Sequence, residues 1–178
     1  RYSEERLPDG VVVAGEFKKP ELVIEHLKSL IKKAYKRPVT RGAVVSLPET
    51  RTFIKVIYVK KPAKPESIPA AILAEAELHI PTPINDLYVD WQHMEDPKDV
   101  PVGKTMSLTI AAAPKQIVDS YSAALEGAGL IPVAFEIEAQ AIVRSAIPRK
   151  DEVGKAVGII DFGATRSSFI AYDKGTIQ

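Results

Sequence analysis

Near its carboxyl end the sequence reads Lys155-Ala-Val-Gly-Ile-Ile-Asp161-Phe-Gly163-Ala-Thr165-Arg-Ser167-Ser-Phe-Ile-Ala-Tyr-Asp-Lys-Gly175, and no other stretch is as informative. An apolar run ends in the pattern Asp-x-Gly-x-Thr, a second apolar run follows, and Asp-Lys-Gly then indicates a turn. The pattern predicts two strands joined by a hairpin, with an acidic side chain at the point where the first strand leaves the core.

The residues around this turn have the chemistry needed to bind phosphate. Gly163 lets the backbone approach an anion closely and tolerates a positive φ angle. Successive backbone amides of the turn can form a concavity that binds anions, and the hydroxyls of Thr165 and Ser167 can extend it. Asp161 is placed to hold a metal-bound water. The alternative is a plain β-hairpin in which the glycines serve only as turn residues.

Composition excludes several classes of function. The 178 residues are 46% hydrophobic and 26% charged, which is typical of one or two folded domains. The 24 basic residues balance 23 acidic ones, so charge gives no argument for binding nucleic acid. The absence of cysteine excludes disulfides, zinc–thiolate sites and thiol nucleophiles. No apolar run reaches the roughly 20 residues of a spanning helix, so we expect any membrane association to be indirect.

The two ends of the sequence suggest a longer parent protein. Arg1 opens a charged stretch without an initiator methionine, and Gln178 ends shortly after what reads as the beginning of another strand. We therefore interpret the chain as a fragment.

Periodicity predicts alternating strands and helices along the chain. The clearest helix is Pro20 to Ala34, because apolar residues recur there at helical spacing. Further helices are expected at 66–79, 114–127 and 136–147, and strands at 41–47, 51–59, 84–93, 104–113 and 131–135. The order across 51–135 favours a small α+β sandwich, with one sheet that carries two helices on one face. The flanking parts read as pieces of an α/β domain that this sandwich interrupts.

Four familiar motifs of nucleotide-binding, catalytic or metal sites are incomplete or absent in this sequence. Val102-Gly-Lys-Thr105 lacks the earlier glycine of a P-loop, because Lys98 occupies that position. Asp161-Phe-Gly163 spells the metal-binding triplet of protein kinases, but no catalytic loop or glycine-rich lid precedes it. No Gly-x-Ser-x-Gly motif is present, and no histidine pair has metal-ligand spacing.

A series of further stretches carries a family resemblance. They are Leu7-Pro-Asp-Gly-Val-Val, Gly15-Glu-Phe-Lys-Lys-Pro, Ala43-Val-Val-Ser-Leu-Pro-Glu, Ala74-Glu-Ala-Glu-Leu-His-Ile80-Pro81-Thr-Pro83-Ile84, Leu87-Tyr-Val-Asp-Trp-Gln92, Ala111-Ala-Ala-Pro-Lys115, Ala124-Leu-Glu-Gly-Ala-Gly-Leu-Ile-Pro132 and Glu136-Ile-Glu-Ala-Gln-Ala141. With the Asp161 loop at the end, they resemble in order the type IV pilus assembly protein PilM. This family of actin-like ATPases forms one branch with the cell-division protein FtsA.

The resemblance implies a fragment of the actin-like ATPase fold. Residues 1–50 and 136–154 would belong to subdomain 1A, residues 51–135 to an inserted subdomain 1C, and residues 155–178 to the first hairpin of subdomain 2A. In the full-length protein, Asp161, Gly163, Thr165 and Ser167 would contact ATP, and Asp161 would bind Mg²⁺ through water. The first phosphate loop and the adenosine motif are missing, so we expect this chain alone to bind ATP weakly or not at all.

The resemblance also implies a partner and a location. The protein would act at the cytoplasmic face of the bacterial inner membrane, where it would bind the cytoplasmic tail of PilN and other pilus inner-membrane components, with self-association as a further possibility. Apolar residues Ile80, Pro81, Pro83 and Ile84 are candidates for the tail site, although they have an alternative interpretation as core and helix-stop residues. We expect at most a slow ATPase. An actin-fold ATPase or small-molecule kinase and an FtsA-like division protein are the alternatives.

Overall fold

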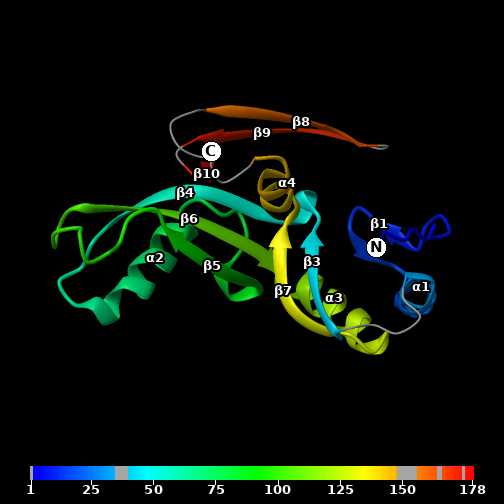
Figure 1. Cartoon of the computed structure of the whole chain (residues 1–178). Helices are drawn as coiled ribbons and strands as arrows, with labels where there is room; N and C mark the ends of the chain where they lie inside the picture. Colours follow the sequence, from blue (N-terminus) through cyan, green and yellow to red (C-terminus); the bar gives the residue numbers. More distant parts are fainter. Residues whose placement is uncertain (1, 35–39, 148–155, 164–165, 174) are drawn as a thin grey trace.

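The computed structural model describes residues 2–34, 40–147, 156–163, 166–173 and 175–178, and Figure 1 shows their arrangement. The α-helices are α1 (Pro20–Ala34), α2 (Ile68–Glu77), α3 (Lys115–Gly127) and α4 (Glu138–Ala146). The strands are β1 (Val12–Val13), β2 (Glu16–Phe17), β3 (Gly42–Leu47), β4 (Phe53–Lys60), β5 (Leu87–His93), β6 (Thr105–Pro114), β7 (Ile131–Ile137), β8 (Val157–Phe162), β9 (Ser167–Asp173) and β10 (Thr176–Ile177). Short 3₁₀ helices are η1 (Glu49–Arg51), η2 (Pro65–Ser67) and η3 (Ile84–Asp86).

An antiparallel sheet with the strand order β4-β6-β5 forms the largest core. Successive side chains of a strand point to opposite faces, so neighbouring residues of β6 belong to different layers and alternate residues share one. Leu108 and Ile110 are fully buried on one face, where they pack in the same cluster as Ile72 of α2. Helix α2 therefore covers one face of this sheet and leaves the other face for different contacts.

The carboxyl-terminal hairpin and α4 pack on the opposite face of the sheet. Strands β8, β9 and β10 form a second antiparallel sheet in the order β10-β9-β8, which lies above α4 in Figure 1. Ile170 and Ile177 of this sheet form a core cluster against which Ile54 and Ala111 also pack. The hydroxyls of Thr109 and Thr176 lie 2.5 Å apart and are buried at this junction.

Strands β3 and β7 form a separate two-stranded sheet, which contradicts part of the predicted sandwich. Strand β7 pairs in parallel with β3, from Ile131 opposite Gly42 to Ile137 opposite Leu47. The prediction that all strands of 51–135 form one sheet is therefore wrong for β7. The register of a parallel pair depends on residues far apart in the sequence, which local periodicity does not report.

The two helices of the predicted sandwich also do not share a face. Ile117 of α3 packs in a cluster with Ala113 and Leu47, whereas α2 packs against the neighbouring β6 residue Ala112 and its layer. Because Ala112 and Ala113 point to opposite faces, α3 and α2 lie on opposite sides of the sheet. This arrangement leaves α3 beside β7, as Figure 1 shows.

Helix α1 begins at Pro20 and ends at Ala34, as predicted. Proline suits the first helical turn, and Lys32 and Lys33 in the last turn complement the helix dipole. Val23 packs with Ala124 of α3 in a small cluster of its own. In the part of the chain that the structure describes, no helix has the length and apolar character needed to cross a membrane.

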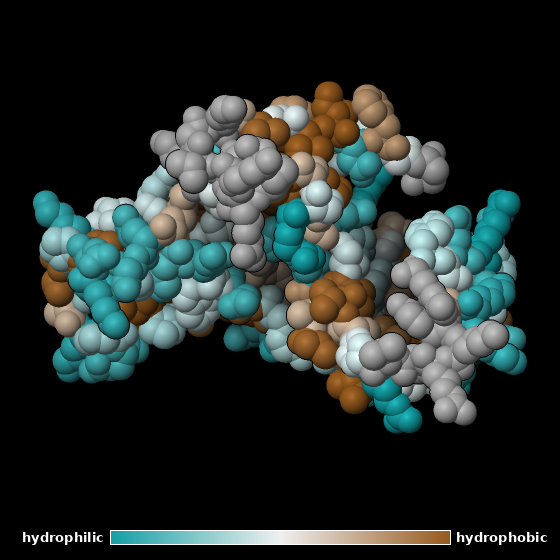
Figure 2. All heavy atoms as spheres, in the orientation of Figure 1, coloured by the Kyte–Doolittle hydropathy of each residue, from teal (hydrophilic) through white to brown (hydrophobic). Residues whose placement is uncertain are grey.

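The outer face of the β8–β9 hairpin is apolar and exposed. Ile160 pairs with Phe169, and both side chains are more than half exposed, as is that of Phe162. Apolar residues gather on this face at the top of Figure 2. The inner face of the same hairpin is buried, so its two faces differ sharply in their contacts.

Candidate functional site

A groove of about 430 Å³ lies on the sheet face that α2 does not cover. Strands β5 and β6 form its floor, and residues of β3, β7, α3 and α4 form its walls. The lining residues are Leu47, Tyr88, Val89, Asp90, Trp91, Gln92, Thr109, Ala111, Ala112, Ala113, Val118, Phe135, Ile137 and Gln140. Apolar and polar side chains both line the groove, and Asp90 is the single charged residue among the described residues that line it.

Small side chains and an open strand edge shape the groove. Ala111 and Ala113 of β6 point into the layer of the groove, and their size leaves room above the sheet. Strand β5 is the last strand in the order β4-β6-β5, so among the described strands only β6 pairs with it. Its outer edge can accept another extended segment, which is the usual way that a sheet edge binds a peptide, although the Trp91 amide there already donates a 2.9 Å hydrogen bond to Asp90 Oδ1.

Tyr88 attaches the beginning of β5 to α3 at the groove. Its hydroxyl donates a hydrogen bond of 3.0 Å to Asp119, and Lys115 Nζ lies 5.7 Å from the centre of its ring. The hydrogen bond to Asp119, followed by the charge of that carboxylate, raises the pKa of Tyr88. Lys115 also donates to the carbonyl of Asn85 at 2.8 Å. These contacts connect the edge strand to the helix that forms one wall.

The predicted partner residues lie elsewhere. Ile80 is buried in the core cluster under α2, and Ile84 packs against that cluster. Both positions fit the alternative interpretation, in which these are core and helix-stop residues. Pro81 and Pro83 are exposed, and neither lines the groove. Sequence reasoning missed the groove because its residues come from four strands and two helices, and the Ala111-Ala-Ala113 run was its only local signal.

The described phosphate-site candidates Asp161, Gly163 and Ser167 lie at the end of β8, just after it, and at the start of β9. Asp161 is partly buried near the end of β8, and Ser167 begins β9. The Gly163 amide donates a 2.8 Å hydrogen bond to the carbonyl of Arg166, and a Cβ atom at Gly163 would lie 2.9 Å from that oxygen. The turn therefore requires glycine at this position. Thr165 lies outside the described residues, and within them no three His, Cys, Asp or Glu side chains are grouped to hold a metal.

A second cleft, of about 770 Å³, adjoins this turn. Its walls are the β1–β2 hairpin, the segment from the end of β3 to η1, Tyr121 of α3, and the first residue of α4. Arg166 forms an ion pair with Glu138 here, and Glu138 Oε2 also accepts a hydrogen bond of 3.3 Å from the Glu49 amide. Burial raises the pKa of Tyr121, and the charge of Glu138 adds to this shift.

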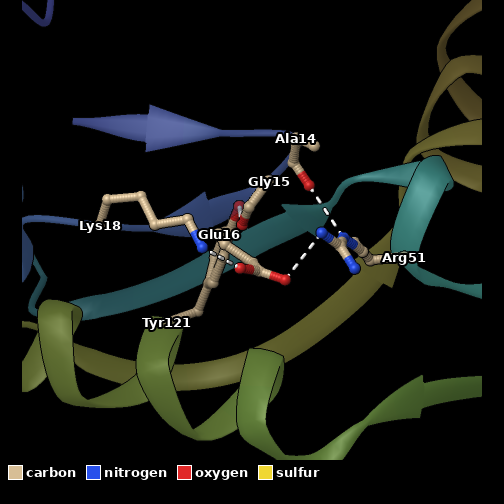
Figure 3. A network of polar contacts seen from close by, with 6 residues as sticks. All are labelled: Ala14, Gly15, Glu16, Lys18, Arg51 and Tyr121. Carbon is tan, nitrogen blue, oxygen red and sulfur yellow. Dashed lines mark hydrogen bonds and ion pairs between the residues drawn. The ribbon is translucent and has the colours of Figure 1, made fainter. Parts of the chain in front are cut away.

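The β1–β2 side of this cleft is held by the polar network in Figure 3. Arg51 donates to the Ala14 carbonyl at 3.1 Å and pairs with Glu16 at 2.7 Å. The Tyr121 hydroxyl donates to the Gly15 carbonyl at 3.0 Å. Gly15 has a φ angle of +80°, and a Cβ atom there would lie 2.4 Å from Pro48 Cγ, so this turn also requires glycine.

A family model for type IV pilus assembly protein PilM matches residues 1–177. The chain belongs to the PilM family. A solved structure described as a PilM–PilN type IV pilus biogenesis complex is similar over 98% of this chain, with 26% identity and a TM-score of 0.84. The chain spans 51% of the length of that solved chain.

A second solved structure shares the fold of this PilM-family chain. It is the cytoplasmic domain of EpsL, an inner membrane component of the type II secretion system of Vibrio cholerae, with 12% identity and a TM-score of 0.56 over 86% of this chain. Together the matches confirm the predicted fold class, a mixed α/β fragment of the actin-like fold of PilM. The subdomain boundaries at 50, 135 and 154 remain an interpretation.

Proposed function

We propose that this chain is part of a PilM-type scaffold for type IV pilus assembly, and that its groove binds the cytoplasmic tail of a PilN-type protein. The solved relative with a TM-score of 0.84 is a PilM–PilN complex, which supports such a partner. The scaffold would work at the cytoplasmic face of the inner membrane, with other pilus inner-membrane components as further partners.

The groove is the observation that carries this proposal. Its volume of about 430 Å³ lies within the roughly 300–1,000 Å³ that is typical of ligand pockets. An extended tail can add to the free edge of β5 while alternate side chains enter the apolar space above Ala111 and Ala113. Asp90 then offers the tail a negative charge at the rim.

In the full-length protein, the β8–β9 turn would contact the phosphates of ATP, and Mg²⁺ bound there would offset their charge. Two observations fit this role: Gly163 leaves no room for a side chain, and Ser167 presents a hydroxyl next to the turn. Asp161 would hold a water on the metal, and Thr165 would extend the contacts. We expect the nucleotide to act mainly as a conformational ligand that alters partner affinity.

Calorimetry with a synthetic PilN amino-terminal tail tests the partner proposal. We expect a stoichiometry near one, and amide chemical-shift changes confined to β5, α3 and β7. A folded chain that does not bind the tail, or shifts that fall on the α2 face of the sheet, would contradict it. An FtsA-like division protein is the runner-up if tail binding fails.

A parallel titration with ATP and Mg²⁺ tests the nucleotide proposal. We expect this chain to bind ATP no more tightly than millimolar, because the turn supplies contacts from one side only. Micromolar affinity would show that the chain holds a complete nucleotide site. Steady-state turnover well above about one per second would favour an actin-fold enzyme over a scaffold.

A further inference from the structure

Asp90 covers part of the open edge of β5. Its carboxylate oxygen Oδ1 accepts a 2.9 Å hydrogen bond from the amide of the next residue, Trp91. Residues two apart in an antiparallel strand direct their backbone groups to the same side, so Val89 and Trp91 present theirs to this edge. Because an occupied amide cannot also give a straight hydrogen bond to an added strand, Asp90 protects the edge where it borders the groove.

The same side chain gives the groove its charge. Asp90 is exposed, and in the described part of the chain no basic side chain pairs with it. Lys115 lies over the ring of Tyr88 and donates to the carbonyl of Asn85, while Asp119 accepts from the Tyr88 hydroxyl. Because Lys115 and Asp119 have opposite charges, the Asp90 carboxylate is the charge that a ligand in the groove meets.

A neutral extended segment that adds to β5 therefore loses a hydrogen bond. Either its carbonyl opposite Trp91 stays without a donor, or the Asp90 carboxylate leaves the amide and gives up a charge-assisted bond. A basic side chain on the added segment offsets this loss, because the carboxylate can pair with the cation as it releases the amide. The carbonyl of the segment then accepts the hydrogen bond from Trp91.

We propose that Asp90 makes the groove select an extended segment with a basic side chain, and that pairing with this side chain frees the Trp91 amide for the backbone of the segment. The inference rests on the proposed function, since the segment is the PilN-type tail, and it adds the chemistry by which the groove recognises that tail. An ion pair at an exposed position such as Asp90 changes an equilibrium by about two- to fivefold. Asp90 is therefore a specificity-determining residue, and the rest of the groove supplies the larger share of the affinity.

Two substitutions at Asp90 separate its charge from its hydrogen bond. Asp90→Asn removes the charge but keeps a side-chain oxygen that can accept from the Trp91 amide. Asp90→Ala removes both, so it leaves that amide open to an added strand. Asp86→Asn is the matched control, because Asp86 is also exposed and lies just before β5 but does not line the groove.

The experiment is a calorimetric titration of the chain and these variants with the synthetic PilN amino-terminal tail. It is repeated with copies of the tail in which each basic residue is replaced in turn by glutamine. In the wild type, one of these replacements should weaken binding about two- to fivefold. Asp90→Asn should lose the same amount with the unmodified tail and lose nothing further with that glutamine copy. In 1 M salt the preference of the wild type for the unmodified tail should disappear.

Asp90→Ala and the Trp91 amide report on the second half of the inference. Asp90→Ala should bind the glutamine copy at least about twofold more tightly than Asp90→Asn does, because its Trp91 amide is open. In the wild type, the Trp91 amide resonance should shift on binding of the unmodified tail, since its acceptor changes from a carboxylate to a carbonyl. Asp86→Asn should match the wild type in both affinity and shift.

The outcomes separate this inference from the partner proposal on which it rests. Tail binding that depends on no basic residue of the tail, or that a replacement weakens equally in the wild type and Asp90→Asn, would overturn selection by Asp90 while the partner proposal stands. Equal affinities of Asp90→Asn and Asp90→Ala for the glutamine copy would overturn the release of the Trp91 amide. If the folded wild type binds neither the tail nor any copy, the partner proposal and this inference fail together. Thermal melting shows that each variant is folded.

Discussion

The two faces of the β4-β6-β5 sheet have opposite roles although they share the same three strands. On one face Leu108 and Ile110 are sealed beneath α2 and have no contact with solvent. On the other face Ala111 and Ala113 leave a groove between the sheet, α3 and β7. The difference shows that large side chains make one face a core, whereas small ones on alternate positions of the same strand leave a groove on the other face.

Leu108→Ala should have the largest effect on stability, because it empties space in the sealed face. We expect the free energy of unfolding to fall by about 2–5 kcal/mol, the usual range for such a truncation in a core. Urea denaturation measures it. Tyr58→Ala, at a β4 position that is 63% exposed, should stay within about 0.5 kcal/mol. Equal losses of unfolding free energy in the two variants would contradict the inferred difference between the two faces.

Val118→Arg should block the groove face while it leaves the sealed face intact. The added side chain occupies the apolar space where the tail is proposed to bind, so tail affinity should fall at least tenfold, or about 1.4 kcal/mol. Calorimetry measures the affinity. Gln116→Arg, at an exposed position of the same helix that does not line the groove, is the matched control. Gln140→Arg on the α4 wall should reproduce the loss, and unchanged binding in both groove variants would contradict the proposed site.

Thr176→Val tests how the hairpin is attached to the groove face of the sheet. The change leaves the buried Thr109 hydroxyl without the partner that lies 2.5 Å away, and we expect a loss of about 1–2 kcal/mol in thermal or urea unfolding. The double variant Thr109→Val with Thr176→Val removes both polar groups, so it should recover most of that loss. A double variant as unstable as the sum of the singles would mean that the two hydroxyls act independently.

Glu16→Gln should give the smallest effect, and this effect should depend on pH. The hydrogen bond from Lys18, followed by the charge of Arg51, lowers the pKa of the Glu16 carboxyl below its ordinary 4.5. A carboxyl with a lowered pKa stabilises the folded state above its unfolded pKa, and that stabilisation disappears as the pH falls through the folded pKa. The melting temperature of Glu16→Gln should therefore lie below that of the wild type at pH 7, and the two should converge as the pH falls through the lowered pKa of the folded state. A gap of constant size would show that charge is not its cause.

Local patterns predicted most of the elements and the family. Helix α1 has the predicted ends because its apolar spacing, its amino-terminal proline and its terminal lysines all favour the same boundaries. The hairpin of β8 and β9 follows from two apolar runs around a glycine turn. The ordered motifs from Leu7 to Gly163 indicated the PilM family, which the match over residues 1–177 confirms.

The sites were less predictable, because they join distant parts of the chain. Arg166 and Glu138 are 28 residues apart, and nothing in the sequence around either one indicates the other. Leu47, Ala111 and Phe135 line the groove together, although they belong to the separate strands β3, β6 and β7. Ile80 and Ile84 were candidates for a partner site with core and helix-stop roles as the alternative, and the structure buries Ile80 and packs Ile84 against the same core cluster.

The sequence by itself determined the element types, the glycine turn at Gly163 and the family, because each follows from spacing and chemistry within short segments or from their order. The tertiary structure alone decided that β7 pairs with β3, that α2 and α3 cover opposite faces, and that Arg166 meets Glu138. The physical reason is that strand pairing and side-chain contacts across a cleft depend on the free energy of the whole packed arrangement. No local run of residues contains that quantity.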